Sequence, residues 1–375
     1  MKKILNFIFF ILLISLTGCV KELLAPNESG VFNLDDDIAI IVNEGLYGYN
    51  NASISLLDLN DNSYVENIFE KVNLYELGDV ANDAITQNNF LYVVVSNSKT
   101  LFKINLNTMK VISKLTFSGN NFPRKLSIIN DSTLLLSDAY SSSIYKVNSN
   151  NMEVEKSINV GPQPEAIANF SHYAYVVNSG WGDINKNAAN SSTISIIDLN
   201  NFVELKKIET GKDPVELAID TINRYLYVMY YNYPSLKDSV GGIIQYDLSD
   251  LNNLNKTNEW FGNFSNLKIS ATGDTLFFIA NNTPGKDNNK NGSIKMLDVQ
   301  RNLMKDILVN YTPNFWYCFT IDVKKNLIWV GNAKNFTSDG EILVYSLNFN
   351  NPNEQPLIKY TTGNNPNRIL LKYHN

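Results

Sequence analysis

The chain has 375 residues, of which 44% are hydrophobic and only 18% charged, a composition that is typical of a globular protein and excludes a disordered one. Its net charge of −6 argues against nucleic acid as a partner, because phosphate binding needs clustered Lys and Arg. The two cysteines are Cys19 and Cys318.

Residues 1–18 predict a lipoprotein signal peptide. Lys2 and Lys3 give a positive start, residues 4–16 are almost wholly apolar, and Leu-Thr-Gly-Cys ends the segment at Cys19. This apolar run is too short to span a bilayer, which needs about 20 residues, but it is typical of a signal peptide. Leu-Thr-Gly-Cys resembles a bacterial lipobox, whose cysteine is acylated; the alternative is an ordinary secretory peptide that ends in Cys. We expect Cys19 to be lipidated and to hold the chain to a membrane.

Residues 19–37 comprise the cysteine expected to be lipidated and a flexible tether. The tether is expected because the segment carries Pro, Gly, Ser, Asn and an acidic triplet and has few side chains that could pack in a core. Val20 after the cysteine, in place of an aspartate, favours the outer membrane over the inner one. If Cys19 is acylated, Cys318 has no partner, and we expect no disulfide.

Residues 38–375 carry a repeat of short runs rich in β-branched and aromatic residues, which is the signature of strands. Each unit has four runs, A to D. The B runs start at Ile38, Phe90, Thr133, Tyr173, Tyr225, Thr275 and Leu327, and the C runs at Ile54, Leu101, Ile144, Thr193, Ile243, Ile294 and Ile342. Four strands at a period of roughly 40 to 52 residues predict an all-β fold, a seven-bladed β-propeller.

The ends of the repeat predict how the ring closes. The first unit begins with a B strand at Ile38, whereas residues 367–373 form an A strand with no B strand after it. We therefore expect the C-terminal strand to complete the N-terminal blade, which removes the open edge.

The long B–C loops and the D–A connections are expected on one face of the ring, here called the loop face. Loops longer than closure requires are often functional, and these are rich in aromatic residues beside Asn and Gly, which suit a flat or ring-bearing ligand. The candidate ligand-binding residues are Tyr47, Tyr49, Phe122, Arg124, Tyr140, Trp181, Tyr231, Tyr233, Phe315, Trp316, Phe336 and Arg368. For some of them, such as Trp316 and Tyr140, a place in the core between blades is the alternative.

One loop matches the start of a calcium-binding loop, with Asp287, Asn289 and Asn291 at the ligand spacing, Ser293 as a carbonyl ligand and Asp298 at the twelfth position. The chain is so rich in Asn that this spacing arises easily, and Asp298 also occupies a repeated position, so a structural role is the alternative. We expect no required cofactor.

The sequence contains few motifs that would indicate a catalytic site. The two histidines are His172, placed in an A–B turn on the opposite face, and His374 next to the C-terminus. No nucleophile elbow or phosphate-binding loop is present. Cys318 lies inside an A strand and is interpreted as a small buried side chain.

Two resemblances rest on these residues. Tyr175-Val-Val-Asn178, with Pro164 before it, resembles the YVTN-type (YncE-like) seven-bladed propeller repeat. The opening, with Asn43-Glu44-Gly45 and Asn51-Ala52-Ser53, resembles a family of surface-exposed propeller lipoproteins that includes the cobalamin-binding BtuG-like proteins. This resemblance implies a lipid-anchored propeller, monomeric apart from a receptor complex, that captures a nutrient and passes it to a TonB-dependent receptor.

Three functions follow. The first is non-enzymatic binding of a small ligand, with a corrinoid as the first candidate. The second is a protein-interaction scaffold in the cell envelope that uses the same loops as a flat patch. The third is a lactonase-like enzyme, which needs carboxylates and a histidine or arginine in the central channel. A funnel lined by Tyr47, Trp181, Tyr231 and Trp316 would favour the first, and dispersed outward aromatics the second.

Overall fold

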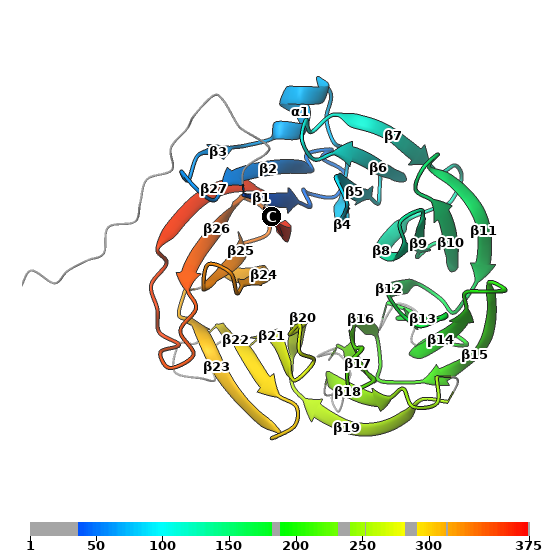
Figure 1. Cartoon of the computed structure of the whole chain (residues 1–375). Coiled ribbons are helices and arrows are strands. Elements are labelled where there is room, and N and C mark those ends of the chain that lie inside the picture. The colour runs from blue at the N-terminus through cyan, green and yellow to red at the C-terminus, as the bar shows by residue number, and fades with distance from the viewer. Residues whose placement is uncertain are drawn as a thin grey trace, which may run out of the picture.

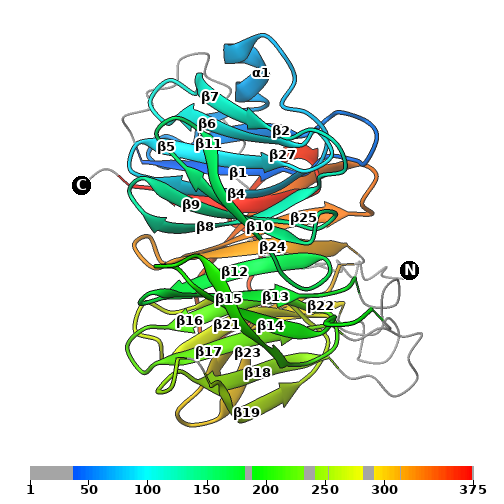
Figure 2. The same cartoon turned by 90° about the vertical axis from the view of Figure 1, so that its right-hand side faces the viewer.

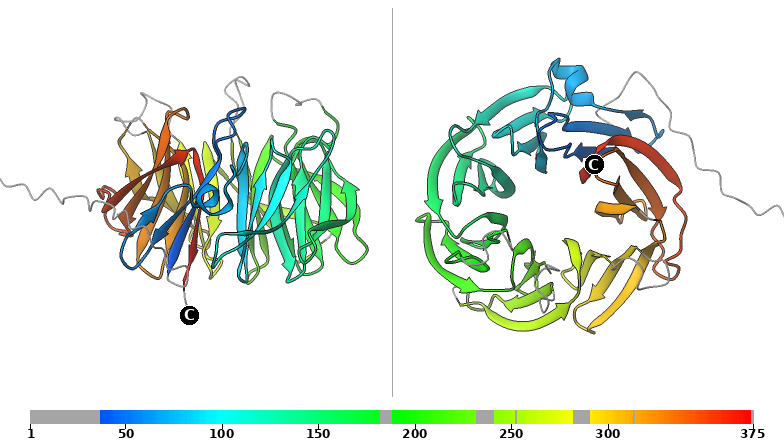
Figure 3. Two further views of the ribbon diagram at one scale, coloured as in Figure 1. Left: turned by 90° about the horizontal axis from the view of Figure 1, so that it is seen from above. Right: turned by 180° about the vertical axis from the view of Figure 1, so that it is seen from behind.

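In the computed structural model, seven four-stranded antiparallel sheets form a ring (Figure 1). The structure describes residues 37–181, 188–231, 241–251, 253–281, 291–312 and 314–373. Figure 2 and the left panel of Figure 3 show the ring edge-on, with the strands of each blade running between its two faces. The prediction of a seven-bladed propeller is confirmed.

The strands fall into the four predicted classes. The innermost A strands are β4 (Ala81–Gln87), β8 (Pro123–Asn130), β12 (Pro164–Phe170), β16 (Pro214–Asp220), β20 (Phe264–Ile269), β24 (Phe315–Asp322) and β28 (Pro366–Lys372). The B strands are β1 (Ile38–Asn43), β5 (Phe90–Val95), β9 (Thr133–Asp138), β13 (Tyr173–Asn178), β17 (Tyr225–Tyr230), β21 (Thr275–Asn281) and β25 (Leu327–Lys334).

The C and D strands form the outer half of each blade. The C strands are β2 (Ser53–Asp58), β6 (Thr100–Asn105), β10 (Ser143–Asn148), β14 (Thr193–Asp198), β18 (Gly242–Asp247), β22 (Gly292–Asp298) and β26 (Asp339–Ser346). The D strands are β3 (Tyr64–Val65), β7 (Val111–Thr116), β11 (Glu153–Asn159), β15 (Val203–Glu209), β19 (Asn255–Phe261), β23 (Leu303–Asn310) and β27 (Ile358–Asn364).

The ring closes as the sequence predicts. Strand β28 pairs antiparallel with β1, with Ile38 opposite Lys372 and Ile41 opposite Ile369, and the sheet order is β28-β1-β2-β3. The first blade is therefore built from both ends of the propeller, and the ring has no open edge between its first and last blades.

One short helix, α1 (Ile68–Asn73), was not expected from the sequence. It lies between β3 and β4 at the periphery of the ring (Figure 1). The D strand of the first blade has only two residues, and Phe69 of α1 is fully buried with its ring 5.5 Å from that of Phe102. Asn73 fixes the helix to the second blade, since its side chain donates to Met109 O and accepts from Val111 N, both at 2.9 Å. None of the described helices has the length and apolar character of a membrane span.

The hydrophobic core lies between neighbouring blades. Ile40 and Val42 of the first blade share one cluster with Leu91 and Val93 of the second, and all four are fully buried. Because successive strand residues point to opposite faces, each blade contributes to the cluster on either side of it. Burial of one such aliphatic side chain stabilises the fold by about 1.5–3 kcal/mol, so each blade depends on both neighbours.

The A strands share a local irregularity that shapes the channel. Each has a shift of register with its B strand near its first residues, for example between Ala81 and Asp83, and between Pro123 and Leu126. Such a bulge breaks the strict alternation of side chains and increases the local twist. Two consecutive residues, such as Arg124 and Lys125, can therefore both line the channel.

The Asn43-Glu44-Gly45 segment locks the closure point. Asn43 is fully buried, donates to Ser53 Oγ at 3.0 Å and accepts from Thr362 Oγ1 at 3.0 Å. Glu44 N donates to Asn365 O at 2.9 Å. Gly45 has a φ of +83°, and a Cβ atom built there would lie 2.7 Å from Ala52 N. The motif thus ties the first B–C loop to the last D–A connection, and only glycine fits its third position.

We expect Gly45→Ala to destabilise the protein by about 2–4 kcal/mol, because a left-handed residue costs about 1–2 kcal/mol and the clash with Ala52 adds to it. Gly48→Ala is the matched control, since Gly48 has the same φ of +83° but no atom within 4 Å of a built Cβ. Its cost should stay near 1 kcal/mol. Urea unfolding measures both variants, and equal losses would contradict the assigned clash.

Candidate functional site

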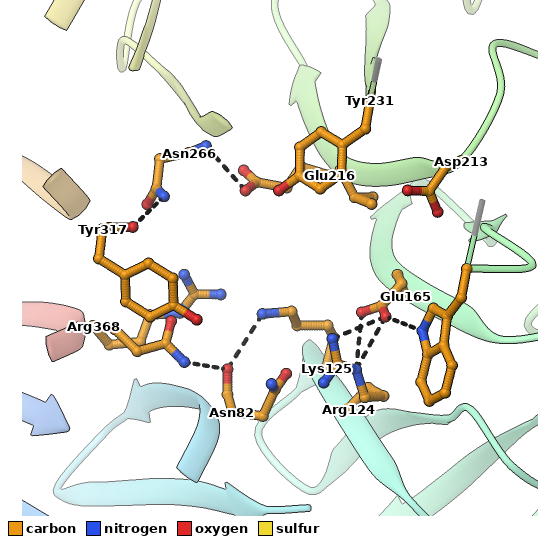
Figure 4. Close-up of a pocket in the computed structure, with 13 residues that line it drawn as sticks. Asn82, Arg124, Lys125, Glu165, Asp213, Glu216, Tyr231, Asn266, Tyr317 and Arg368 are labelled. Atoms are coloured by element: carbon orange, nitrogen blue, oxygen red, sulfur yellow. Dashed lines mark hydrogen bonds and ion pairs between the residues drawn. The ribbon is translucent and has the colours of Figure 1, made fainter. Parts of the chain in front are cut away.

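The centre of the ring holds two adjoining hollows, each of about 460 Å³. The channel hollow is lined mainly by the starts of A strands, and Figure 4 shows its labelled side chains arranged around an open centre. The rim hollow is lined mainly by loop-face residues such as Tyr47, Phe122 and Tyr140. Arg124, Trp181 and Tyr317 line both, so the two hollows form one funnel. Small-molecule sites typically enclose roughly 300–1,000 Å³, and this funnel has that scale.

Three aromatic side chains form a preformed wall at the mouth. The ring of Phe122 stacks on Tyr140 at 4.8 Å, and Trp181 meets both edge-on at 6.2 Å and 5.6 Å. Trp181 has a left-handed φ of +49°, which few non-glycine residues adopt. Its backbone N donates to Ser179 Oγ at 3.0 Å and its indole Nε1 to Glu165 Oε1 at 2.9 Å, so the ring orientation is fixed.

Arg124 is held on all sides below this wall. Its Nε lies 3.0 Å and 3.1 Å from the two carboxylate oxygens of Glu165, and its Nη2 lies 2.9 Å from Oε1. In the amide orientation that satisfies both groups, Asn82 accepts from Nη1 at 2.7 Å. The guanidinium also lies 5.7 Å from the ring of Phe122. With every donor group engaged, Arg124 is a fixed positive charge beneath the aromatic mouth.

A second ion pair, between a buried carboxylate and a partly buried guanidinium, joins the first and second blades. Arg368 Nε and Nη2 each lie 2.7 Å from Asp83 Oδ1, while Asp83 Oδ2 accepts from Leu126 N at 2.9 Å. Burial alone would raise the pKa of Asp83, but the charges of Arg368 and Lys125 and these hydrogen bonds hold it below its usual value. Asp83 is therefore ionised in the folded protein at neutral pH.

Lys125, next to Arg124, has no carboxylate partner. Its Nζ donates to Asn82 O at 3.2 Å, and no ion pair is formed with the described residues. Burial, and then the positive charge of Arg368, lower the pKa of Lys125 to about 8. Lys268 of β20 lies near Arg368 and Glu216, and burial followed by the charge of Arg368 lowers its pKa as well.

The far side of the funnel is built from carboxylates and a tyrosine. Glu216 accepts from Asn266 N at 3.1 Å and Leu267 N at 2.6 Å, so its charge is held by the next blade. Tyr317 donates its hydroxyl to Glu44 Oε2. Burial, and then the charge of Glu44, raise the pKa of Tyr317 well above its usual value, so the phenol stays a neutral donor.

The structure brings most of the sequence-predicted residues together. The predicted residues that line the funnel are Tyr47, Phe122, Arg124, Tyr140, Trp181, Tyr231 and Arg368. Phe336 lies just behind it, with its ring 5.6 Å from Tyr317 and 5.2 Å from the half-exposed Phe315. Tyr49 is 72% exposed and lines neither hollow. Tyr233 lies outside the described residues.

Trp316 lies in the core and not in the funnel. It is 7% exposed and packs in the cluster with Phe319 and Tyr345, its ring 6.1 Å from that of Tyr345. The register of β24 shifts on both sides of Trp316, and the neighbouring Tyr317 faces the funnel instead. A slip of one residue exchanges the two faces of a strand, which is the reason for this difference.

The predicted calcium ligands do not gather where the structure describes them. Asp298 ends β22 and accepts from Arg301 N at 2.9 Å, whereas Ser293 lies at the other end and donates to Asp306 at 2.7 Å. The strand between them spans on the order of 15 Å, so they cannot hold one ion. Asn291 donates to Thr312 O. Asp287 and Asn289, like Cys19 and His374, lie outside the described residues, and the described part of the chain has no cluster of three His, Cys, Asp or Glu side chains fit for a metal.

Sequence reasoning missed most of the polar lining. Asn82, Lys125, Glu165, Asp213, Glu216, Asn266, Tyr317 and Asn367 line the channel hollow. A signal was present: several A strands begin with proline, and one or both of the next two residues carry a charge or an amide, as in Pro123-Arg124-Lys125, Pro214-Val215-Glu216 and Pro366-Asn367-Arg368. Aligning the starts of the seven A strands would have placed these side chains in the channel.

Cys318 and His172 both lie away from the funnel. Cys318 is buried, donates to Pro366 O at 3.1 Å, and has its pKa raised to about 11 by burial. His172 is exposed on the face opposite the funnel, with its ring 4.1 Å from that of Tyr173. Neither side chain lines the funnel.

Comparison with known proteins places the chain in a family. Residues 38–286 match the family model described as "Domain of unknown function (DUF5074)", and the chain belongs to this family. The sequence matches no curated protein.

Solved structures share the fold at low sequence identity. A putative 6-phosphogluconolactonase from Bacteroides fragilis is 12% identical with a TM-score of 0.64, covering 91% of this chain and 99% of its own. The periplasmic gluconolactonase of Pseudomonas aeruginosa is 13% identical with a TM-score of 0.64, covering 90% and 99%. A quinonprotein alcohol dehydrogenase-like protein from Bacteroides thetaiotaomicron is 14% identical with a TM-score of 0.63, covering 92% and 79%.

We expect Asp83→Asn to lower the free energy of unfolding at pH 7 by about 3 kcal/mol, because it leaves the Arg368 guanidinium buried without its carboxylate. The folded-state pKa of Asp83 is depressed, so its contribution is complete above the unfolded pKa of about 3.9 and is lost as the pH falls through the folded value. Denaturant unfolding from pH 7 to pH 3 should therefore show the difference from the wild type shrinking in acid.

Asp298→Asn is the control for this variant. Asp298 pairs with the 81% exposed Arg301, and the amide oxygen of asparagine can still accept from Arg301 N. The expected loss is under about 0.5 kcal/mol. A loss for Asp83→Asn that is as small as this control would remove the structural role assigned to the buried pair.

Proposed function

We propose that this DUF5074 protein is a lipid-anchored, non-enzymatic binding protein of the bacterial outer membrane. In this proposal it captures a small ring-bearing and polar ligand in the funnel, with a corrinoid as the first candidate, and delivers it to a TonB-dependent transporter. The observation that supports it is the funnel itself, in which the wall of Phe122, Tyr140 and Trp181 stands above a channel of charged and amide side chains.

The chemistry of the funnel matches an amphipathic ligand. Aromatic faces offer broad apolar contact to a flat ring system, while the fixed charges and amides below can hold polar substituents. A corrinoid combines a flat macrocycle with amide side chains at its edge. Because the two hollows share Arg124, Trp181 and Tyr317, one ligand can extend over both.

The cellular part of the proposal rests on the sequence. The lipobox-like Leu-Thr-Gly-Cys at Cys19 supports a lipid anchor, and Val20 supports the outer membrane. The Asn43-Glu44-Gly45 opening, which resembles surface-exposed propeller lipoproteins, also carries Glu44 into the rim hollow. The alternative of a protein-interaction scaffold would use a flat patch, whereas Tyr47, Trp181 and Tyr231 line a hollow.

Binding of cyanocobalamin and dicyanocobinamide to the full-length protein in detergent tests the proposal by calorimetry and tryptophan quenching. We expect a dissociation constant in the micromolar range or below, and Trp181→Ala should weaken binding at least about tenfold because it removes the central member of the aromatic wall. Tyr49→Ala removes an aromatic side chain from the same face outside the funnel, and should leave the affinity unchanged. Absence of binding to both corrinoids would eliminate this ligand class.

A second candidate function, hydrolysis of a sugar lactone, is favoured by one observation. The channel hollow presents the carboxylates of Glu165 and Glu216 and the guanidinium groups of Arg124 and Arg368, the kinds of group that such chemistry requires. Two solved structures of this fold are described as gluconolactonases, one of them putative. The non-enzymatic proposal predicts no acceleration of δ-gluconolactone hydrolysis in a pH-stat, whereas turnover that is lost in Glu216→Gln would establish the enzyme.

A further inference from the structure

The cations of the channel differ in how they are paired. The A strands place four cations around it, Arg124, Lys125, Lys268 and Arg368, and three carboxylates, Asp83, Glu165 and Glu216. Asp213, just before β16, adds a fourth carboxylate to the lining, and each of these carboxylates has partners of its own.

Each carboxylate has its own partners. Glu165 pairs with Arg124 and accepts from Trp181, Asp83 pairs with Arg368 and accepts from Leu126 N, and Glu216 accepts from two backbone N–H groups of β20. Among the described residues, the ammonium groups of Lys125 and Lys268 form no ion pair, and Arg368 Nη1 has no partner.

Two of the unpaired donors share one hollow, and Lys268 lies near them. Lys125 and Arg368 both line the channel hollow, and the charges of Arg368 and Asp83 act on both Lys125 and Lys268. A partly buried charge without a counterion is costly, and the hollow beside Lys125 leaves space for an external anion.

We propose that Lys125 and Arg368, with the nearby charge of Lys268, form a subsite that binds an oxyanion group of the ligand, a phosphate or a carboxylate. Arg368 Nη1 and the free hydrogens of the Lys125 ammonium donate to its oxygens. This inference deepens the proposed function, because it assigns an anionic group to the ligand that enters the funnel.

The depressed pKa of Lys125 gives the subsite a pH dependence. Lys125 is influenced by Arg368, Asp83, Arg124 and Glu165 from the surrounding strands, and its pKa is lowered to about 8. An anion binds the charged ammonium only, so affinity should be highest below this value and fall as the pH rises through it.

The test measures binding of inorganic phosphate and of acetate to the full-length protein in detergent, by calorimetry and by quenching of tryptophan fluorescence. We expect phosphate to bind in the millimolar range or tighter and Lys125→Gln to weaken it about tenfold or more. Lys125→Arg should retain binding and abolish its decline between about pH 7 and pH 9.5. Lys305→Gln, which removes an exposed lysine on β23, should change nothing. Acetate binding with the same variant pattern would identify a carboxylate subsite, and phosphate alone a phosphate subsite.

The experiments distinguish a failure of the anion subsite from a failure of the proposed corrinoid function. Cyanocobalamin carries a phosphodiester that cobinamide lacks, so Lys125→Gln should weaken the first more than the second. If phosphate binds through Lys125 but no corrinoid binds, the subsite holds and the ligand class is wrong. If neither anion binds, or if Lys125→Gln binds them as tightly as the wild type while thermal melting shows it folded, the subsite is refuted, whatever the result with corrinoids.

Discussion

The inner edge of the blades is the constraint on which this structure depends. Each A strand pairs with a B strand on one side only, so its other edge presents backbone N–H and C=O groups to the channel and to the next blade. Side chains of neighbouring A strands form hydrogen bonds with these backbone groups. Asp83 and Glu216, at equivalent positions of β4 and β16, accept from the backbone N–H groups of the following A strands, and Asn367 donates to Asn82 O at 2.9 Å.

The same constraint makes the channel polar and therefore able to bind. Carboxylates that hold the next blade bring buried negative charge, and arginines such as Arg368 balance it at 2.7 Å. Because Arg124 and Glu165 satisfy each other, they act as rigid scaffolding for Trp181. Lys125, one residue further along β8, has no carboxylate partner among the described residues. The supporting residue Arg124 and the proposed binding residue Lys125 are therefore adjacent in the sequence.

The blades could be predicted from the sequence because their signals are local and repeated. The B and C runs recur with Gly, Pro and Asn between them, and the missing A strand before Ile38 indicated the closure by β28. The helix α1 could not be foreseen, since Phe69 has to be seen packing on Phe102 before six residues are recognised as a helix.

The site was only partly predictable, for a physical reason. Aromatic residues in the loops, such as Tyr140 and Trp181, indicate a binding face from the sequence alone. The charges on the A strands can be recognised only when the starts of the seven strands are aligned, because a bulge decides which residues turn inward. Trp316 and Tyr317 are adjacent, and the register shift of β24 sends the first into the core and the second into the funnel. No pattern of hydrophobicity distinguishes these two.

The pairing of β1 with β28 also has a consequence for folding. Ile38 and Lys372 are partners although more than 300 residues separate them, and contacts so distant in sequence slow folding because a long loop must close first. While the intervening blades form, β1 keeps a bare edge that can recruit strands of other chains. The edge of β1 therefore stays unpaired until the last strand of the propeller is available, whereas an open sheet of the same size would keep free edges even when folded.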